Sequence, residues 1–286
     1  MTTFRFNFSG EDDDSNKIEK KETIQWLDCE EVVPDLQIQN VDDEVTRAKM
    51  FTCGDVEIGH VVINEAMASI EESGLKNVIK LAEKEHSDLV AGKYEGKCGL
   101  KIWECTYDLI QYLEENHKEI KFDKSNVLDL GCGAGILGIY SFLNNSNVTF
   151  QDYNKEVLEH FTIPNVILNI EEEDKRETET QRCKFYSGDW DSFNKKLPSS
   201  QVYDTILTSE TIYNEYNYEK LISLFMDRLS KDGAAYVAAK TYYFGVGGGT
   251  RQFEEAVQRH GKFISTVCWK STGGIQREIL KITHKP

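Results

Sequence analysis

The sequence of 286 residues lacks the features that mark membrane-spanning or secreted proteins. No apolar run approaches the roughly eighteen residues that a transmembrane helix needs. The first residues, MTTFRFNFSGEDDD, lack the basic and apolar regions of a secretory signal peptide. We therefore expect a protein of the cytosol or nucleus that does not contact a membrane.

Paired cysteines are also missing. The seven cysteines are odd in number and form no CxxC pair, and the six histidines do not cluster with them. Zinc sites and disulfide frameworks both depend on such spacings. We interpret the cysteines as reduced thiols, mostly buried, and expect no metal site.

Positive charge is scarce. The chain has 33 Lys and Arg but 49 Asp and Glu, which gives a net charge of −16. Residues 1–44 alone hold thirteen acids and four bases. An acidic surface repels phosphate backbones, so direct nucleic-acid binding is disfavoured, whereas a basic protein partner would be attracted. The same charge also fits the simpler interpretation that it keeps the protein soluble.

Two regions differ in composition. Residues 1–50 are polar and acidic, with weak periodicity, and we interpret them as a flexible N-terminal segment. Residues 51–286 are expected to form the folded domain, with a β/α extension over 51–103. Apolar residues make up 40% of the chain, which suffices for a core.

From Asn126 onward, short apolar strands alternate with helical segments. This rhythm predicts an α/β fold with a mostly parallel sheet covered by helices on both faces. The last two strand-like segments, 262–269 and 276–283, have no helix between them. They are therefore expected to form an antiparallel hairpin.

The segment VLDLGCGAG (Val127–Gly135) is a strand that enters a turn with glycines at alternate positions. Glycine permits a sharp turn and the close approach of a ligand to the backbone. The next strand ends at Asp152, where an acid can accept hydrogen bonds from ribose hydroxyls. The pattern indicates a nucleoside-bearing cofactor.

A dinucleotide is the alternative ligand, because Gly133, Gly135 and Gly138 spell GxGxxG. However, Gly131 already follows the strand directly, and Asp129 lies inside the strand end. A carboxylate there would oppose a diphosphate and suits a cation such as S-adenosylmethionine.

Several motifs recur in a fixed order: DLGCGAG, QDYN (151–154), GDW (188–190) and LTSETIYN (207–214), with IWECT (102–106) ahead of them and KTYYFGVGGG (240–249) after. Over roughly residues 90–286 they resemble the seven-strand S-adenosylmethionine-dependent methyltransferases of the branch that modifies protein side chains. The closest resemblance is to the eukaryotic histidine protein methyltransferases. It implies a Rossmann-like seven-stranded sheet, S-adenosyl-L-methionine as cofactor, and a histidine of a large-subunit ribosomal protein as acceptor. A monomer in cytoplasm and nucleus is also expected.

The resemblance also implies roles for cofactor-binding residues. The glycine turn would approach the methionine part, the acid after the second strand would bind ribose, and the GDW motif would bind adenine. A tryptophan-glutamate segment would close one wall, and a serine would lie near the methyl group. The residues in these positions are Gly131, Gly133, Gly135, Asp129, Asp152, Asn154, Gly188, Asp189, Trp190, Trp103, Glu104, Thr106 and Ser209.

Two residues are the catalytic candidates. Glu210 and Tyr213 follow a strand of the parallel sheet, whose carboxyl ends carry ligands. A carboxylate that accepts from one ring N–H of histidine leaves the other nitrogen free to attack. Glu210 is predicted to do this, with Tyr213 as a wall of the acceptor slot. Glu210 would equally suit a helix cap or a salt bridge.

Other functions fit parts of the pattern. A protein-lysine methyltransferase would share these motifs, and a non-catalytic chaperone for a basic protein would explain the acidic segment. A small-molecule or RNA methyltransferase would share the fold, since fold does not fix the acceptor. The net charge argues against an RNA substrate. The Asn-Pro-Pro-aromatic segment that methyltransferases of amides and exocyclic amines often carry does not follow the strand before Glu210.

Overall fold

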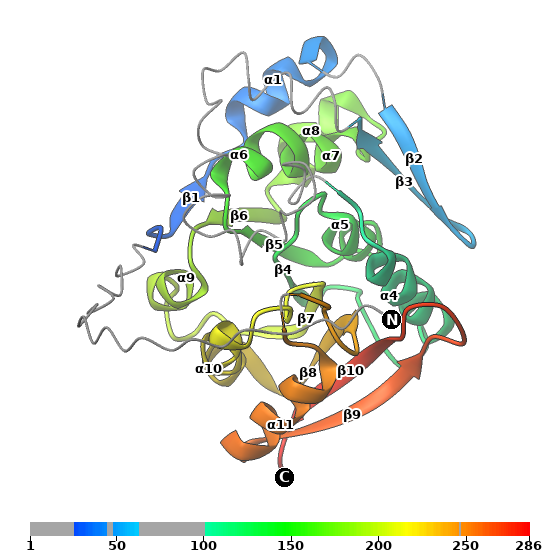
Figure 1. Ribbon diagram of the computed structural model, residues 1–286. Helices are drawn as coiled ribbons and strands as arrows, with labels where there is room; N and C mark the ends of the chain where they lie inside the picture. Colours follow the sequence, from blue (N-terminus) through cyan, green and yellow to red (C-terminus); the bar gives the residue numbers. More distant parts are fainter. Residues whose placement is uncertain (1–25, 45–47, 63–100, 246) are drawn as a thin grey trace, which may run out of the picture.

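The computed structural model describes residues 26–44, 48–62, 101–245 and 247–286. In this part of the chain the main sheet has eight strands in the order β1-β6-β5-β4-β7-β8-β10-β9, shown in Figure 1. Its strands are β1 (Glu30–Val32), β4 (Asn126–Leu130), β5 (Asn147–Asp152), β6 (Cys183–Ser187), β7 (Tyr203–Ser209), β8 (Leu229–Lys240), β9 (Phe263–Lys270) and β10 (Arg277–His284). A separate hairpin pairs β2 (Ala48–Cys53) with β3 (Val56–Val61).

Strand directions confirm the expected fold class. Strands β6, β5, β4, β7 and β8 are parallel, and β10 is antiparallel to both β8 and β9. The hairpin predicted at the C-terminal end of the sequence is therefore present. The strand β1 is an addition to the seven expected strands: it pairs antiparallel with β6, where Val32 faces Phe185.

Part of the range 1–50, described above as a flexible acidic segment, thus belongs to the sheet. Its buried Val32 joins the core, and α1 (Asp35–Glu44) packs against α7. Of the proposed extension over 51–103, the hairpin β2–β3 is seen, whereas residues 63–100 lie outside the described part.

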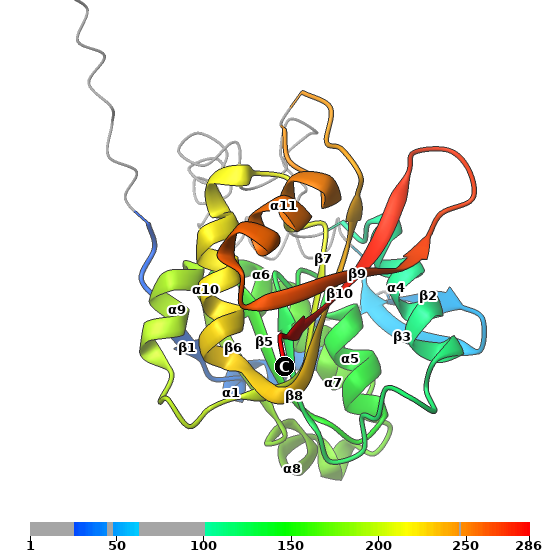
Figure 2. The same ribbon diagram turned by 90° about the horizontal axis from the view of Figure 1, so that it is seen from below.

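Helices cover both faces of the sheet (Figure 2). On one face lie α4 (Glu104–Glu115), α5 (Ile136–Leu143) and α7 (Ile163–Leu168); on the other lie α9 (Trp190–Lys196), α10 (Tyr218–Arg228) and α11 (Thr250–His260). The shorter segments are α6 (Lys155–Val157), η1 (Leu158–Thr162), η2 (Glu173–Lys175), α8 (Arg176–Thr180) and η3 (Glu215–Asn217).

The two cores follow from the alternation of side chains along each strand. In β4, Val127 packs in the cluster that contains Leu109 of α4, and the next residue, Leu128, packs in the cluster that contains Phe225 of α10. Neighbouring residues of a strand point to opposite faces, so a strand covered on both sides is apolar throughout.

The parallel strands place their carboxyl ends along one edge. Leu130, Asp152, Ser187 and Ser209 end β4, β5, β6 and β7, and the candidate motifs follow them. Within the described ranges, none of the helices has the length and apolarity to cross a membrane, and no group of three His, Cys, Asp or Glu is placed to hold a metal ion.

Candidate active site

The loop after β4 turns through three glycines in the left-handed region: Gly131 (φ +66°), Gly133 (φ +50°) and Gly135 (φ +75°). Residues with a Cβ rarely adopt this conformation. A Cβ at Gly131 would lie 2.7 Å from Thr211 Cγ2, and one at Gly135 would lie 2.9 Å from Thr162 Cγ2. Glycine is therefore required here both for backbone conformation and for space.

Side chains that follow β5 hold this turn in place. Thr162 Oγ1 donates to the carbonyl oxygen of Gly133 at 2.6 Å, and Asn165 Nδ2 donates to that of Ala134 at 2.8 Å. Thr162 ends the π-helical turn η1, a rare conformation that is frequent at functional sites. The glycine turn is thus a fixed surface.

Asp152, at the end of β5, faces the glycine turn. Its Oδ2 accepts from Gly133 N at 2.9 Å, and its Oδ1 accepts from Asn154 N at 3.1 Å. Each carboxylate oxygen can accept about two hydrogen bonds, so capacity remains for a ligand. Burial raises the pKa of Asp152 to about 6, and the backbone N–H groups of Asn154, Gly133 and Tyr153 oppose that rise.

Asp129 lies in β4, just before the same turn. Its Oδ2 accepts from Gly138 N at 2.8 Å, in the first turn of α5. Its side chain is buried, and burial raises its pKa to about 8. A cation bound beside Asp129 would stabilise its carboxylate and lower this pKa.

At the β6 end of the cavity, Trp190 Nε1 donates to Gln151 Oε1 at 3.0 Å, which fixes the indole. Asp189 Oδ1 forms an ion pair with Lys220 Nζ at 2.6 Å. Lys220 in turn lies over the ring of Trp26, 3.1 Å from its centroid. A tryptophan from the N-terminal region thus borders a site built from motifs more than seventy residues later.

The backbone beside Trp26 is docked as well. Asp189 N donates to the carbonyl oxygen of Leu27 at 2.9 Å, and Leu27 N donates to Tyr153 Oη at 3.3 Å. A Cβ at Gly188 would lie 2.5 Å from the carbonyl oxygen of Asp28. Gly188 therefore permits the chain at Asp28, just before β1, to approach the end of β6 closely.

At the opposite end of the cavity, the carboxyl end of β7 carries Ser209 and Glu210. Ser209 Oγ lies 3.1 Å from Thr106 Oγ1 of α4. Glu210 has a left-handed backbone (φ +59°), which is rare for a residue with a Cβ. Strained backbone of this kind is concentrated at functional sites.

The Glu210 side chain is almost fully buried. Its Oε2 accepts a hydrogen bond from Tyr243 Oη at 2.6 Å, and its Oε1 lies 3.5 Å from Lys240 Nζ. Oε1 has no hydrogen-bond partner among the described residues. Tyr213 stands edge-on to Tyr243, with ring centroids 6.1 Å apart. Glu210 caps no helix described here; at the next one, η3, Asn214 accepts from Tyr216 N.

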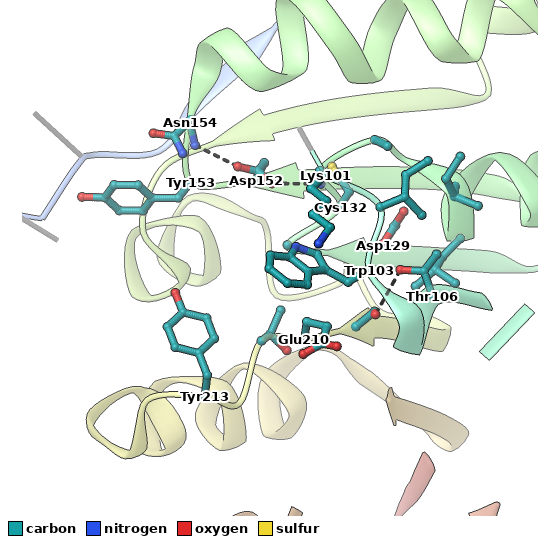
Figure 3. Close-up of a pocket in the computed structure, with 18 of the residues that line it drawn as sticks. Lys101, Trp103, Thr106, Asp129, Cys132, Asp152, Tyr153, Asn154, Glu210 and Tyr213 are labelled. Atoms are coloured by element: carbon teal, nitrogen blue, oxygen red, sulfur yellow. Dashed lines mark hydrogen bonds between the residues drawn. The ribbon is translucent and has the colours of Figure 1, made fainter. Parts of the chain in front are cut away.

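One continuous cavity joins these groups (Figure 3), with an empty volume of about 1140 Å³ that includes space open to solvent. Of the fifteen residues that the sequence indicated, all but Glu104, Gly135 and Gly188 line it. Glu104 is exposed in the first turn of α4. Gly135 and Gly188 shape the cavity through the close backbone contacts described above.

Further residues line the cavity that the sequence did not indicate: Trp26, Lys101, Ile102, Cys132, Ala134, Ile136, Leu137, Tyr153, Thr211 and Asn217. Most of them lie inside or beside the quoted motifs, so proximity to a motif was a usable signal. Trp26 had no such signal. Lys101 lies over the ring of Trp103, with Nζ 4.2 Å from the centroid.

A comparison with protein families decides the assignment. The model of a family described as lysine methyltransferase matches residues 83–251. The chain belongs to this family. The match spans the glycine turn, Asp152, the GDW motif and Glu210, which are the residues that the cavity brings together.

The chain is also similar to curated proteins. It is 41% identical to a histidine protein methyltransferase 1 homolog of Bos taurus, over 73% of this chain and 61% of the relative. The corresponding protein of Dictyostelium discoideum is 43% identical, over 73% of this chain and 64% of the relative. The chain therefore spans somewhat over three fifths of these relatives. A protein N-lysine methyltransferase METTL21A of Xenopus tropicalis is 27% identical, over 50% of this chain and 60% of the relative.

The methyl donor of this methyltransferase family is S-adenosylmethionine, and the side chains that line the cavity suit it. Asp152 offers negative charge to a cationic ligand, and a sulfonium or ammonium group would favour the carboxylate form of Asp129, whose pKa burial raises to about 8. Side chains at Gly131 and Gly133 would stand where the turn approaches the ligand. Asp152 would bind the ribose hydroxyls, and Trp190 would flank the adenine ring.

Cofactor affinity is expected to depend on pH through Asp152. Because burial raises its pKa to about 6, the carboxylate is present above this pH and is lost as the pH falls through it. Affinity for S-adenosylmethionine should then decrease by up to about tenfold per pH unit below 6. Calorimetric titration between pH 5 and pH 7 measures this.

The control for this dependence is Asp152→Asn. This variant should bind more weakly at pH 7 and show a flatter pH profile around 6. Glu156→Gln, which alters an acid that acts on Asp152 only through its charge, should keep the profile. A wild-type profile in Asp152→Asn would mean that another group titrates.

Proposed function

We propose that this protein transfers a methyl group from S-adenosylmethionine to a ring nitrogen of a histidine in another protein. The observation that carries the proposal is the buried Glu210 at the end of the cavity formed by Glu210 and Tyr213, which we call the acceptor end: its Oε1 has an ion-pair partner, Lys240, but no hydrogen-bond partner among the described residues. The similarity to histidine protein methyltransferases at 41% and 43% identity supports the same acceptor.

The chemistry follows from the side chains present. S-adenosylmethionine, when bound, supplies an electrophilic methyl group on a sulfonium. A histidine with an ordinary pKa of about 6.5 is mostly neutral at cellular pH, so no strong base is needed. Glu210 accepts the N–H of one ring nitrogen and thereby leaves the lone pair of the other nitrogen available. Tyr213 forms a wall that limits how the ring can turn, which favours in-line attack.

The protein substrate is proposed to be a basic protein of the large ribosomal subunit. The net charge of −16 would attract such a partner and would speed encounter with it. We further propose that the enzyme acts as a monomer in cytoplasm and nucleus. The six cysteines in the described residues are all free thiols, as a reducing compartment requires.

The test is to incubate the purified protein with labelled S-adenosylmethionine and total ribosomal proteins, and to map the methylated residue by mass spectrometry. Label on a histidine of one basic protein is expected, and Gly133→Arg should abolish it. If the wild type binds a basic partner but transfers no label, and Gly133→Arg behaves in the same way, the protein would instead be a non-catalytic chaperone.

Lysine is the second candidate acceptor. It is favoured by the description of the matching family as lysine methyltransferase and by the similarity to METTL21A. The same mapping distinguishes the two, because methyl-lysine and methyl-histidine differ in fragment mass. Label on lysine alone would replace the histidine proposal.

A further inference from the structure

A compact cluster of charged and polar side chains lies behind the acceptor end of the cavity. Glu210 follows β7, and Lys240 ends the neighbouring parallel strand β8. Tyr243 follows three residues later and donates to Glu210 Oε2 at 2.6 Å, while Lys240 Nζ lies 3.5 Å from Glu210 Oε1. Little of either charged side chain is exposed, 16% for Lys240 and 8% for Glu210.

The cluster has no net charge. The Glu210 carboxylate and the Lys240 ammonium compensate each other. Burial and the neighbouring Glu210 raise the pKa of Tyr243 well above its usual range, so its hydroxyl stays protonated. The same two causes raise the pKa of the Cys105 thiol, which is also neutral.

Further positive charge lies beside it. Lys240 Nζ is 5.1 Å from the centroid of the Trp103 ring, and Lys101 Nζ is 4.2 Å from the same centroid. Trp103, Glu210 and Lys101 all line the cavity. An acceptor that reaches Glu210 therefore meets a carboxylate that already has a cation and a hydroxyl donor.

We infer that Lys240, together with Tyr243, makes the acceptor end select a neutral imidazole over an ammonium group. This inference rests on the proposed function and concerns the same acceptor site. A buried carboxylate without a counterion would attract the ammonium of a lysine, whose ordinary pKa is about 10.4. With Lys240 in place that attraction is offset. The affinity for a neutral imidazole does not decrease, because an imidazole needs only a hydrogen-bond acceptor.

Lys240 thus acts through Glu210 as a specificity-determining residue, and Tyr243 acts as a positioning residue that fixes the carboxylate. The pair also distinguishes two functions within one fold family. A family member that lacks the cation would present net negative charge to its acceptor and would suit lysine, whereas this chain presents none.

The experiment compares Lys240→Gln with the wild type in binding, without turnover. Two fluorescent peptides serve as probes. One contains the mapped acceptor histidine, and the other has lysine at the same position. Affinities are measured by anisotropy in the presence of S-adenosylhomocysteine. The wild type should prefer the histidine peptide, and Lys240→Gln should shift the ratio of the two dissociation constants at least tenfold toward the lysine peptide.

Two further variants guard against loss of folding. Lys240→Arg keeps the charge and should keep the preference for histidine. The double variant Glu210→Gln with Lys240→Gln removes both charges and should return the ratio to within about threefold of the wild type. The matched control is Lys281→Gln: Lys281 lies on β10, opposite Tyr236 of β8, which is four residues along β8 from Lys240, and its replacement should change nothing.

The outcomes separate the inference from the proposed function. A ratio that does not change in Lys240→Gln, while the variant still binds S-adenosylhomocysteine, overturns the inference alone. If Lys240→Gln does not fold, the ratio of the two dissociation constants is measured in Lys240→Arg and in the double variant instead. Loss of the histidine preference in Lys240→Arg then overturns the inference. A wild-type protein that methylates lysine and not histidine contradicts both.

Discussion

Replacing Glu210 with glutamine is expected to lower kcat about 100-fold while changing the affinity for S-adenosylmethionine less than threefold. Glutamine keeps the shape of the side chain but loses the charge, and its amide can donate where the carboxylate only accepts. The expected loss is that of an orienting hydrogen bond, at the lower end of the roughly 10²–10⁴-fold that positioned acid-base groups contribute to rate. The measurement is single-turnover methylation at saturating cofactor, together with calorimetric titration of the cofactor.

The matched control is Glu219→Gln, an exposed acid in the first turn of α10. It should retain wild-type kcat. This result would show that the fall in kcat of Glu210→Gln does not come merely from the loss of one negative charge. If Glu210→Gln retained normal kcat, the carboxylate would be a structural partner of Lys240 and Tyr243 only. A loss confined to cofactor affinity would place Glu210 at the methionine end instead.

The second large effect concerns Arg228, the last residue of α10. Replacing it with methionine is expected to lower the free energy of unfolding by about 3–5 kcal/mol, as for other buried charged groups in hydrogen-bond networks. Its guanidinium donates to Asn194 Oδ1 and to four backbone carbonyl oxygens, and the side chain is buried. Those carbonyls belong to Asn194, Leu197, Pro198 and Gln201.

The cost arises because methionine leaves several buried acceptors without a donor, at about 1–3 kcal/mol each. Chemical denaturation followed by circular dichroism measures the change. Arg259→Met, at an exposed position in α11, should remain within about 0.5 kcal/mol of the wild type. An equal effect in the two variants would mean that the Arg228 network contributes nothing specific.

The Arg228 network also bears on the active site. It ties the end of α9 and the chain before β7 to α10, and α9 begins directly after Asp189. We therefore expect Arg228→Met to weaken cofactor binding as well, by loosening the helix that places Asp189 and Trp190 in the cavity. Its effect on stability should exceed its effect on kcat.

Much of the cofactor end was readable along the chain, because its residues are local. The glycines follow a strand at fixed spacing, and Asp152 ends the next strand, so strand periodicity alone placed them on one edge. Apolar strands with alternating helices likewise predicted the two-sided parallel sheet. Glu210 and Tyr213 were recognisable as residues after a strand end.

Their partners were not recognisable. Nothing in the sequence pairs Glu210 with Tyr243, 33 residues later, or with Lys240. Trp26 was hidden for the same reason: its place at the cavity depends on hydrogen bonds of the neighbouring Leu27 backbone with Tyr153 Oη and with Asp189 N. The strand β1 is only three residues long, too short to show periodicity.

The sequence by itself determined the order of strands and helices, the glycine turn and the acids that follow the strands, because these depend on backbone conformation and on the period of side chains within one element. Only the tertiary structure decided which groups share a buried environment. Parallel strands bring residues from distant parts of the chain to adjacent positions, and a carboxylate such as Glu210 acquires its charge balance, its hydrogen bond and its selectivity from those neighbours.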